Sequence, residues 1–101
     1  SQLEQLAWQA AANSDLADGH PAFYEAAFEL EQTAGTFLEV VDGKKGLAWI
    51  NGHLLGRYWE RGPQKTLYVP APWLQAGTNR VVWLELEGRS TQAALRAAPS
   101  L

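Results

Sequence analysis

Two pairs of glutamates have a spacing from which a hydrolytic site could be built. Glu29 and Glu31, and likewise Glu85 and Glu87, stand two residues apart in segments that alternate polar and apolar residues. Residues two apart lie on one face of a strand, with Cα atoms about 6.7 Å apart. Glycoside cleavage needs two carboxyl groups held in fixed geometry. The same alternation predicts that these glutamates are ordinary charges on a solvated face, so we expect no catalytic residue among them.

Other patterns of catalysis and metal binding are missing from the sequence. There is no Gly-x-Ser-x-Gly turn to present a nucleophilic serine. The two histidines, His20 and His53, lie far apart and there is no cysteine, so no metal-ligand spacing exists. The glycines are spread over turns and do not open a helix, which argues against a phosphate-binding loop. We therefore predict no metal and no cofactor.

Aromatic and polar residues gather in the stretch Gly46–Trp59, GLAWINGHLLGRYW. Indole rings stack on the C–H face of a pyranose while Asn, Arg and Tyr donors hold its hydroxyls, so sugar binding is one hypothesis. The other is that these aromatic side chains fill a core or an interface with another domain. The residue types alone leave both hypotheses open.

Composition narrows the class of protein. The chain has 101 residues, the size of one domain, and its net charge of −3 argues against a nucleic-acid partner. No apolar run reaches the roughly 18 residues of a membrane-spanning helix, so no membrane partner is expected. The absence of any methionine favours a piece of a longer polypeptide. Localisation is not readable from these features.

Most of the chain has the pattern of short strands. Residues 3–11 are the exception, because Leu3, Leu6, Ala7, Ala10 and Ala11 have helical spacing and predict a short amphipathic helix. Beyond it, alternation and turn residues predict strands over about 23–31, 36–41, 47–50, 67–69 and 80–87, a return strand from His53, an Asn51-Gly52 hairpin turn, and a turn at 76–79. The last residues, 91–101, fit either a closing strand or a tail.

This order of elements predicts an all-β fold, an antiparallel jelly-roll sandwich with at most one short helix, in which residues 1–101 form a single domain. Within the segment Arg80–Glu87, the alternation places Glu85 and Glu87 on the outer face. Val82, Leu84 and Leu86 are then expected on the inner face. Val81 and Trp83 would lie on the outer face and form an exposed patch suited to docking.

Read continuously from Gly43 to Gly88, the chain resembles the C-terminal β-domain of β-galactosidases of glycoside hydrolase family 35. Pro21–Tyr24 also resembles the entry into that domain, which extends the similarity to about residues 21–88. The matching motifs are Lys45-Gly46, Trp49-Ile50-Asn51-Gly52, Leu55-Gly56-Arg57-Tyr58-Trp59, Gly62-Pro63-Gln64, Thr66-Leu67-Tyr68-Val69-Pro70, Trp73-Leu74 and Leu84-Glu85-Leu86-Glu87.

The resemblance implies a galactose-binding-like jelly roll from an enzyme that removes terminal β-linked galactose with retention. It also implies a partner, a TIM-barrel catalytic domain that carries both catalytic glutamates and is not contained in this chain. The chain by itself is then not an enzyme but an accessory domain that packs on and stabilises the barrel. Arg57, Tyr58 and Trp59 are the expected contacts.

The alternative is a carbohydrate-binding module that takes a galactose-containing carbohydrate. Its pocket would be lined by Trp49, Asn51, Trp59 and Trp73. Together the two hypotheses give six candidate site residues and no catalytic one.

Overall fold

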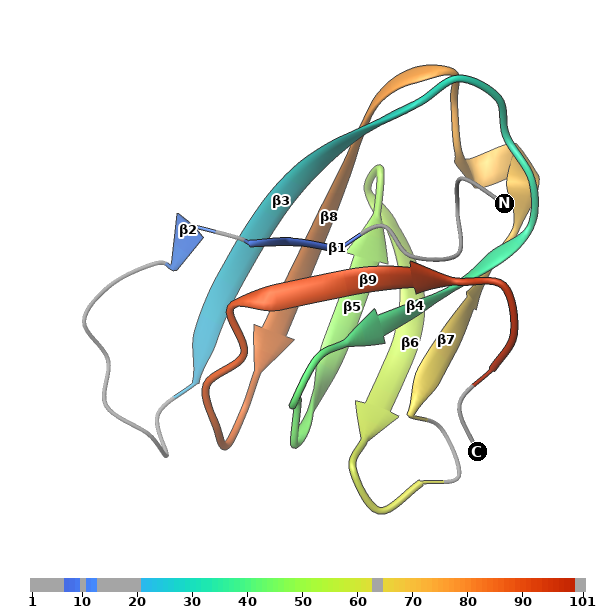
Figure 1. Ribbon diagram of the computed structural model, residues 1–101. Helices are drawn as coiled ribbons and strands as arrows, with labels where there is room; N and C mark the ends of the chain where they lie inside the picture. The colour runs from blue at the N-terminus through green and yellow to red at the C-terminus, as the bar shows by residue number, and fades with distance from the viewer. Residues whose placement is uncertain (1–6, 10, 13–20, 63–64, 100–101) are drawn as a thin grey trace.

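Two antiparallel sheets, one of four and one of five strands, make up the computed structural model (Figure 1), which describes residues 7–9, 11–12, 21–62 and 65–99. The four-stranded sheet has the order β1 (Ala7–Gln9), β9 (Gln92–Arg96), β4 (Thr36–Val40) and β7 (Thr66–Val69). The five-stranded sheet has the order β2 (Ala11–Ala12), β3 (Ala22–Leu30), β8 (Gly77–Glu85), β5 (Lys45–Ile50) and β6 (His53–Trp59). The expected all-β antiparallel sandwich is confirmed.

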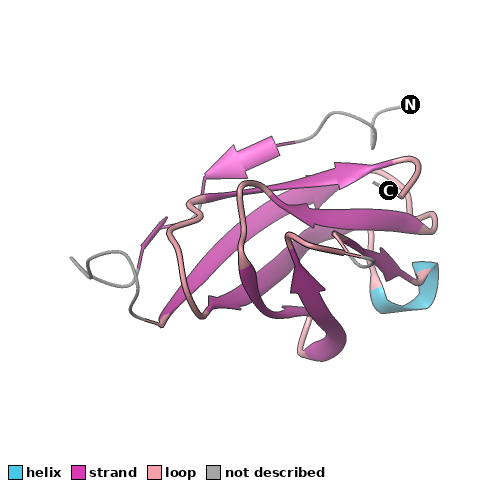
Figure 2. Ribbon diagram, turned by 90° about the horizontal axis from the view of Figure 1, so that it is seen from below, coloured by secondary structure: helices cyan, strands magenta, loops and turns pink. Residues whose placement is uncertain are grey.

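The only helical element among the described residues is a 3-10 turn, η1 (Ala71–Trp73), at one end of the sandwich (Figure 2). It follows Pro70, which comes directly after β7 at the edge of its sheet, where a proline without an N–H is tolerated. No helix in the described ranges is long and apolar enough to span a bilayer.

The core lies between the two sheets because strands alternate buried and exposed residues. β3 is the clearest case, since every second residue from Ala22 to Leu30 is buried. Trp83 of β8 lies at the centre, where it stacks on Tyr24 with 5.6 Å between ring centroids. Its indole N–H donates to the Ser90 carbonyl at 3.2 Å, which satisfies the polar atom of a buried side chain.

The Asn51-Gly52 turn joins β5 to β6 as the sequence predicts. Both residues have positive φ, 47° and 85°, which is the requirement of a type I′ hairpin turn. The prediction of a turn at 76–79 is wrong over its last three residues, because β8 already begins at Gly77. Asn79 is buried and its side chain binds the backbone of Gln75, so it fixes the chain reversal from within the strand.

The helix predicted for residues 3–11 is wrong where it falls on described residues. Ala7–Gln9 pairs with β9 and Ala11–Ala12 pairs with β3, both antiparallel, while residues 3–6 and 10 lie outside the described part of the chain. Alanine-rich sequence has a helical preference of only tenths of a kcal/mol per residue, and pairing with a sheet edge outweighs it. The closing segment 91–101 contains a strand, β9.

The prediction of which β8 residues face the core and which face outward is also wrong. Val81 and Trp83 are fully buried in the core, and so is Glu85, whereas Val82, Leu84 and Leu86 are only partly buried and face outward. The alternation of the sequence predicts a solvated face at Glu85. In the structure, polar groups from three other segments surround this carboxylate and allow it to face inward.

Candidate functional site

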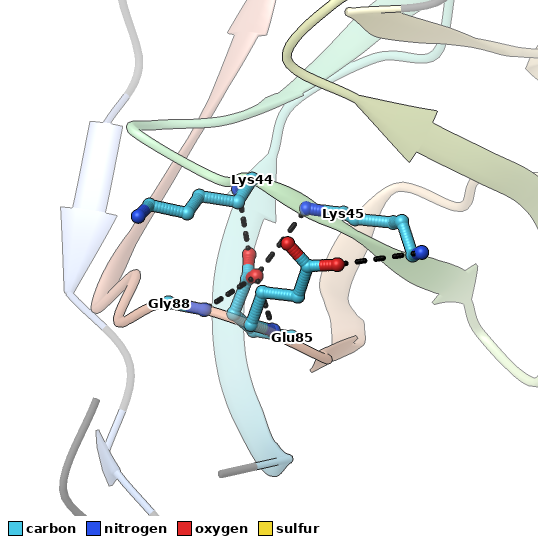
Figure 3. A network of polar contacts seen from close by, with 5 residues as sticks. Lys44, Lys45, Glu85 and Gly88 are labelled. Atoms are coloured by element: carbon cyan, nitrogen blue, oxygen red, sulfur yellow. Dashed lines mark hydrogen bonds and ion pairs between the residues drawn. The ribbon is translucent and has the colours of Figure 1, made fainter. Parts of the chain in front are cut away.

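The Glu85 carboxylate forms the most densely bonded polar cluster described in the domain (Figure 3). Its Oε1 accepts from the Lys44 N–H at 3.0 Å and from the Tyr58 hydroxyl at 2.9 Å. Its Oε2 accepts from the N–H groups of Lys45 (3.3 Å), Glu87 (3.1 Å) and Gly88 (3.0 Å). Five donors occupy both oxygens, so this carboxylate ties together β6, β8 and the β4–β5 turn and is not available to a substrate.

Tyr58 supplies the one side-chain donor in this cluster. Its pKa is raised well above the ordinary value of 10, mainly by burial and then by the charge of Glu85 and the hydrogen bond to it. The hydroxyl therefore remains a proton donor at neutral pH. Gly46 makes room for the ring, because a Cβ at that position would lie 2.5 Å from the Tyr58 hydroxyl oxygen.

The two glutamate pairs of the sequence do not form a pair of free carboxylates. Glu87 is exposed and pairs with Lys45, with Nζ and Oε2 3.3 Å apart. Glu29 accepts from the Thr78 hydroxyl on the neighbouring strand. Glu31 lies just beyond the end of β3. The prediction that Glu85 is a surface charge is wrong, since its side chain is completely buried.

Asn51 and Trp73 lie together at the end of the sandwich opposite Glu85. The Asn51 amide N–H₂ donates to the Trp73 carbonyl and to the Asn79 side chain, both at 2.8 Å. The Asn51 side-chain oxygen accepts from the Arg80 N–H at 2.9 Å. The Trp73 ring stacks on His53, with centroids 4.7 Å apart and planes 12° from parallel. Bonds within the domain thus occupy both polar atoms of the Asn51 side chain.

Trp49 lies on the outer face of the five-stranded sheet, within a group of apolar side chains. Cross-strand pairing places Phe23, Leu84 and Leu47 in one row and Val82, Trp49 and Leu54 in the next. Phe23 is 48% exposed and Leu54 53% exposed, and the rings of Phe23 and Trp49 are 6.3 Å apart. We call these six residues the outer patch. The ion pair of Arg80 with Glu25 bounds it at one end, and that of Lys45 with Glu87 at the other.

Arg57, Tyr58 and Trp59 follow one another on β6 and so alternate between its two faces. Tyr58 points inward, while Arg57 and Trp59 are exposed on the side of the outer patch. Within the described chain, the Arg57 guanidinium has neither a hydrogen-bond nor an ion-pair partner. Trp59 is 44% exposed, and the Arg61 guanidinium carbon lies 5.8 Å from its ring centroid.

Two hollows flank Trp59. The larger, of about 310 Å³, lies between the β4–β5 turn and the end of β6 and is lined by Glu39, Val40, Asp42, Gly43, Lys44, Tyr58, Trp59, Glu60 and Lys65. The smaller, of about 170 Å³, is lined by Lys45, Arg57, Tyr58 and Trp59. No group of three or more metal-ligating side chains occurs among the residues that the structure describes.

The structure therefore brings Trp49, Arg57 and Trp59 to one face, buries Tyr58, and places Asn51 and Trp73 at the far end of β5. Sequence reasoning missed Glu85 as a structural centre and Phe23, Leu47 and Leu84 as surface residues. The alternation of β3, in which Phe23 is out of phase with the buried residues, was the one available signal for the outer patch.

Comparisons with known proteins agree with this architecture. Residues 21–79 match the family model described as "Beta-galactosidase, galactose-binding domain". The human "Beta-galactosidase-1-like protein 2" is 48% identical over 66 residues, which cover 64% of this chain and 10% of that protein. "Beta-galactosidase 17" of Arabidopsis thaliana is 38% identical over 88 residues, or 83% of this chain and 13% of that protein.

"Beta-galactosidase 8" of rice is 38% identical over 80 residues, or 75% of this chain and 12% of that protein. The chain thus spans only about a tenth of the length of these relatives. The family model covers more than half of the chain, from β3 to β7, and so includes the β5–β6 hairpin. The chain belongs to the galactose-binding domain family of β-galactosidases.

Proposed function

We propose that this chain is a non-catalytic accessory domain of a β-galactosidase, and that it docks on the TIM-barrel catalytic domain of the same polypeptide. The observation that carries the proposal is the outer patch. Six apolar side chains lie side by side on the outer face of the five-stranded sheet, and no other described strand covers them. Exposed apolar surface of this kind, rimmed by charges, is typical of an interface.

The sequence of β8 supports the same conclusion. An antiparallel sheet with one solvated face alternates apolar and polar residues, whereas a strand covered on both faces is apolar nearly throughout. Residues 81–84, Val-Val-Trp-Leu, are of the second kind. Val81 and Trp83 are covered by the four-stranded sheet, and Val82 and Leu84 require a second cover.

Bond cleavage in such an enzyme would come from carboxylates outside this domain. Glu85 is enclosed by five donors, and Glu87, Glu39 and Glu25 are each paired with a cation. A retaining mechanism requires one carboxyl group free to attack and a second free to donate a proton, about 5 Å away. Carboxylates engaged in this way are not free for those two roles, which supports assigning the chemistry to the barrel.

Two measurements test the proposal. The purified chain should hydrolyse no β-galactoside, while the full-length protein should do so. Hydroxyl-radical labelling should modify Phe23, Trp49 and Leu54 readily in the isolated chain and much less in the full-length protein, with Tyr68 on the other sheet as the internal reference. Turnover by the isolated chain, or equal labelling of the outer patch in both forms, would overturn the proposal.

A second function, galactose binding, is favoured by the larger hollow beside Trp59. Its volume of about 310 Å³ is at the lower end of small-molecule pockets. Trp59 offers an indole ring, and Glu39, Asp42, Glu60, Lys44 and Lys65 offer acceptors and donors for hydroxyl groups.

Titration of galactose and lactose against tryptophan fluorescence tests this second function. Saturable quenching at about millimolar sugar, lost in Trp59→Ala and kept in Trp49→Ala, would support it. Quenching that is absent, or that is equally changed in both variants, would leave docking as the only function.

A further inference from the structure

We infer that the smaller hollow beside Trp59 is a socket for an Asp or Glu side chain from the part of the β-galactosidase that covers the outer patch. This inference rests on the proposed docking function and adds to it the chemistry of one contact. We call this hollow, lined by Lys45, Arg57, Tyr58 and Trp59, the carboxylate socket.

The register of the β5–β6 hairpin builds the socket. Lys45 is the cross-strand partner of Trp59, and Leu47 is the partner of Arg57. Directly paired residues share a face, and residues two apart on β6 share it as well. Because Tyr58 points into the core, Lys45, Arg57 and Trp59 all project outward. The socket therefore opens on the same side as the outer patch and adjoins it at Leu47.

The charges around the socket are unbalanced. Lys45 is paired with Glu87. Among the described residues, neither Arg57 nor Arg61 has an ion-pair partner, and Arg61 lies over the Trp59 ring. Glu60, the next acidic residue along the chain, lines the larger hollow. An Arg guanidinium presents paired N–H donors that match the two oxygens of a carboxylate. The group that completes this arrangement is an anion.

Size and position indicate that this anion is a protein side chain. A volume of about 170 Å³ is smaller than the range of about 300–1,000 Å³ typical of small-molecule pockets. The socket also continues the outer patch, so a segment that covers Leu47 and Leu84 brings its own side chains to Arg57. Trp and Arg, which both line the socket, are among the residue types that most often dominate the binding energy of an interface. The relatives are more than six times as long as this chain, and so contain ample sequence to supply the segment.

Carbodiimide cross-linking of the full-length protein tests the inference. In the variant Arg57→Lys, the reagent should join the new amine to an acidic residue outside residues 1–101, and mass spectrometry should identify that residue. The Lys45–Glu87 pair, at 3.3 Å, provides a positive control for the reagent within the domain. Arg89→Lys is the matched control, because Arg89 is exposed on the β8–β9 loop and does not line the socket. Cross-links from position 57 only to Glu60 or Glu87, or none at all, would overturn the inference.

Charge reversal provides a second readout. In the full-length protein, Arg57→Glu should raise radical labelling of Trp49 and Leu84 to nearly the level of the isolated chain, whereas Arg57→Lys and Arg89→Glu should not. If labelling stays low in Arg57→Glu, the outer patch is still covered and the carboxylate socket is refuted while docking stands. If the patch is labelled equally with and without the rest of the protein, docking itself fails.

Discussion

The buried Glu85 carboxylate should be the most sensitive polar position in the domain, and Glu85→Gln tests this with almost no change in shape. A glutamine side chain presents one oxygen and one NH₂ group to the same five donors. In its better orientation, the glutamine oxygen takes the place of Oε2 of Glu85 and still accepts hydrogen bonds from the N–H groups of Lys45, Glu87 and Gly88. The NH₂ group then faces the Lys44 N–H and the Tyr58 hydroxyl.

The magnitude follows from these contacts. The Tyr58 hydroxyl can rotate and accept, but the Lys44 N–H, which is part-buried, loses its acceptor, at a cost of at most about 1–3 kcal/mol. The three bonds that remain change from charged to neutral acceptors and each weakens by about 0.5–1 kcal/mol. The sum, about 2.5–6 kcal/mol, is a large part of the 5–15 kcal/mol typical of a whole domain.

Urea unfolding of the purified chain, followed by tryptophan fluorescence, measures this loss. Glu87→Gln is the matched control, because it makes the same chemical change two residues away on an exposed carboxylate. Its expected cost is less than about 1 kcal/mol, as for other surface ion pairs. Equal losses in the two variants would show that the five donors do not hold Glu85 as argued.

Three further predictions concern the same region and its surface. The raised pKa of Tyr58 contributes stability that is complete below pH 10 and is lost as pH rises above it, because the unfolded chain releases this proton first. Alkaline unfolding curves should therefore fall more steeply for the native protein than for Tyr58→Phe, by up to about 1.4 kcal/mol per pH unit. Gly46→Ala should lower the thermal midpoint strongly, because its Cβ would lie 1.9 Å from the Leu84 carbonyl oxygen, whereas Gly88→Ala, which meets only the flexible methylenes of Lys44, should lower it less. Arg80→Ala should change the free energy of unfolding by less than about 1 kcal/mol, since its ion pair on β3 is exposed; a larger loss in denaturant titration would contradict this.

Local signals were enough to predict much of the fold. The Asn51-Gly52 turn and the alternation from Phe23 to Leu30 each act within a few residues. The structure has a hairpin turn between β5 and β6 at the first and the strand β3 at the second. The resemblance to β-galactosidases rested on motifs in the same part of the chain, and the family match confirms it.

Distant partners decided what the sequence could not show. Glu85 faces inward because Lys44, about forty positions earlier, and Tyr58, 27 positions earlier, supply donors that alternation does not reveal. Strands β1 and β2 exist because β9 and β3 have edges to pair with. Likewise, Asn51 and Trp49 are two residues apart in the chain, yet one is used inside the domain and the other faces outward, a division that depends on Trp73 and Asn79 reaching the hairpin.

The order of strands also shows that the segment matched by the family model is shorter than the folded domain. The family match ends at residue 79, the third residue of β8, although β8 is the central strand between β3 and β5. A shortened protein cut to residues 21–79 would lose most of that strand and all of β9. One edge of β4 and one edge of β5 would be left unpaired, and β3 would lose β2 and keep only the first residues of β8. Such a product would expose unpaired backbone along three strands and self-associate, so any excised version of this domain has to keep β1 through β9.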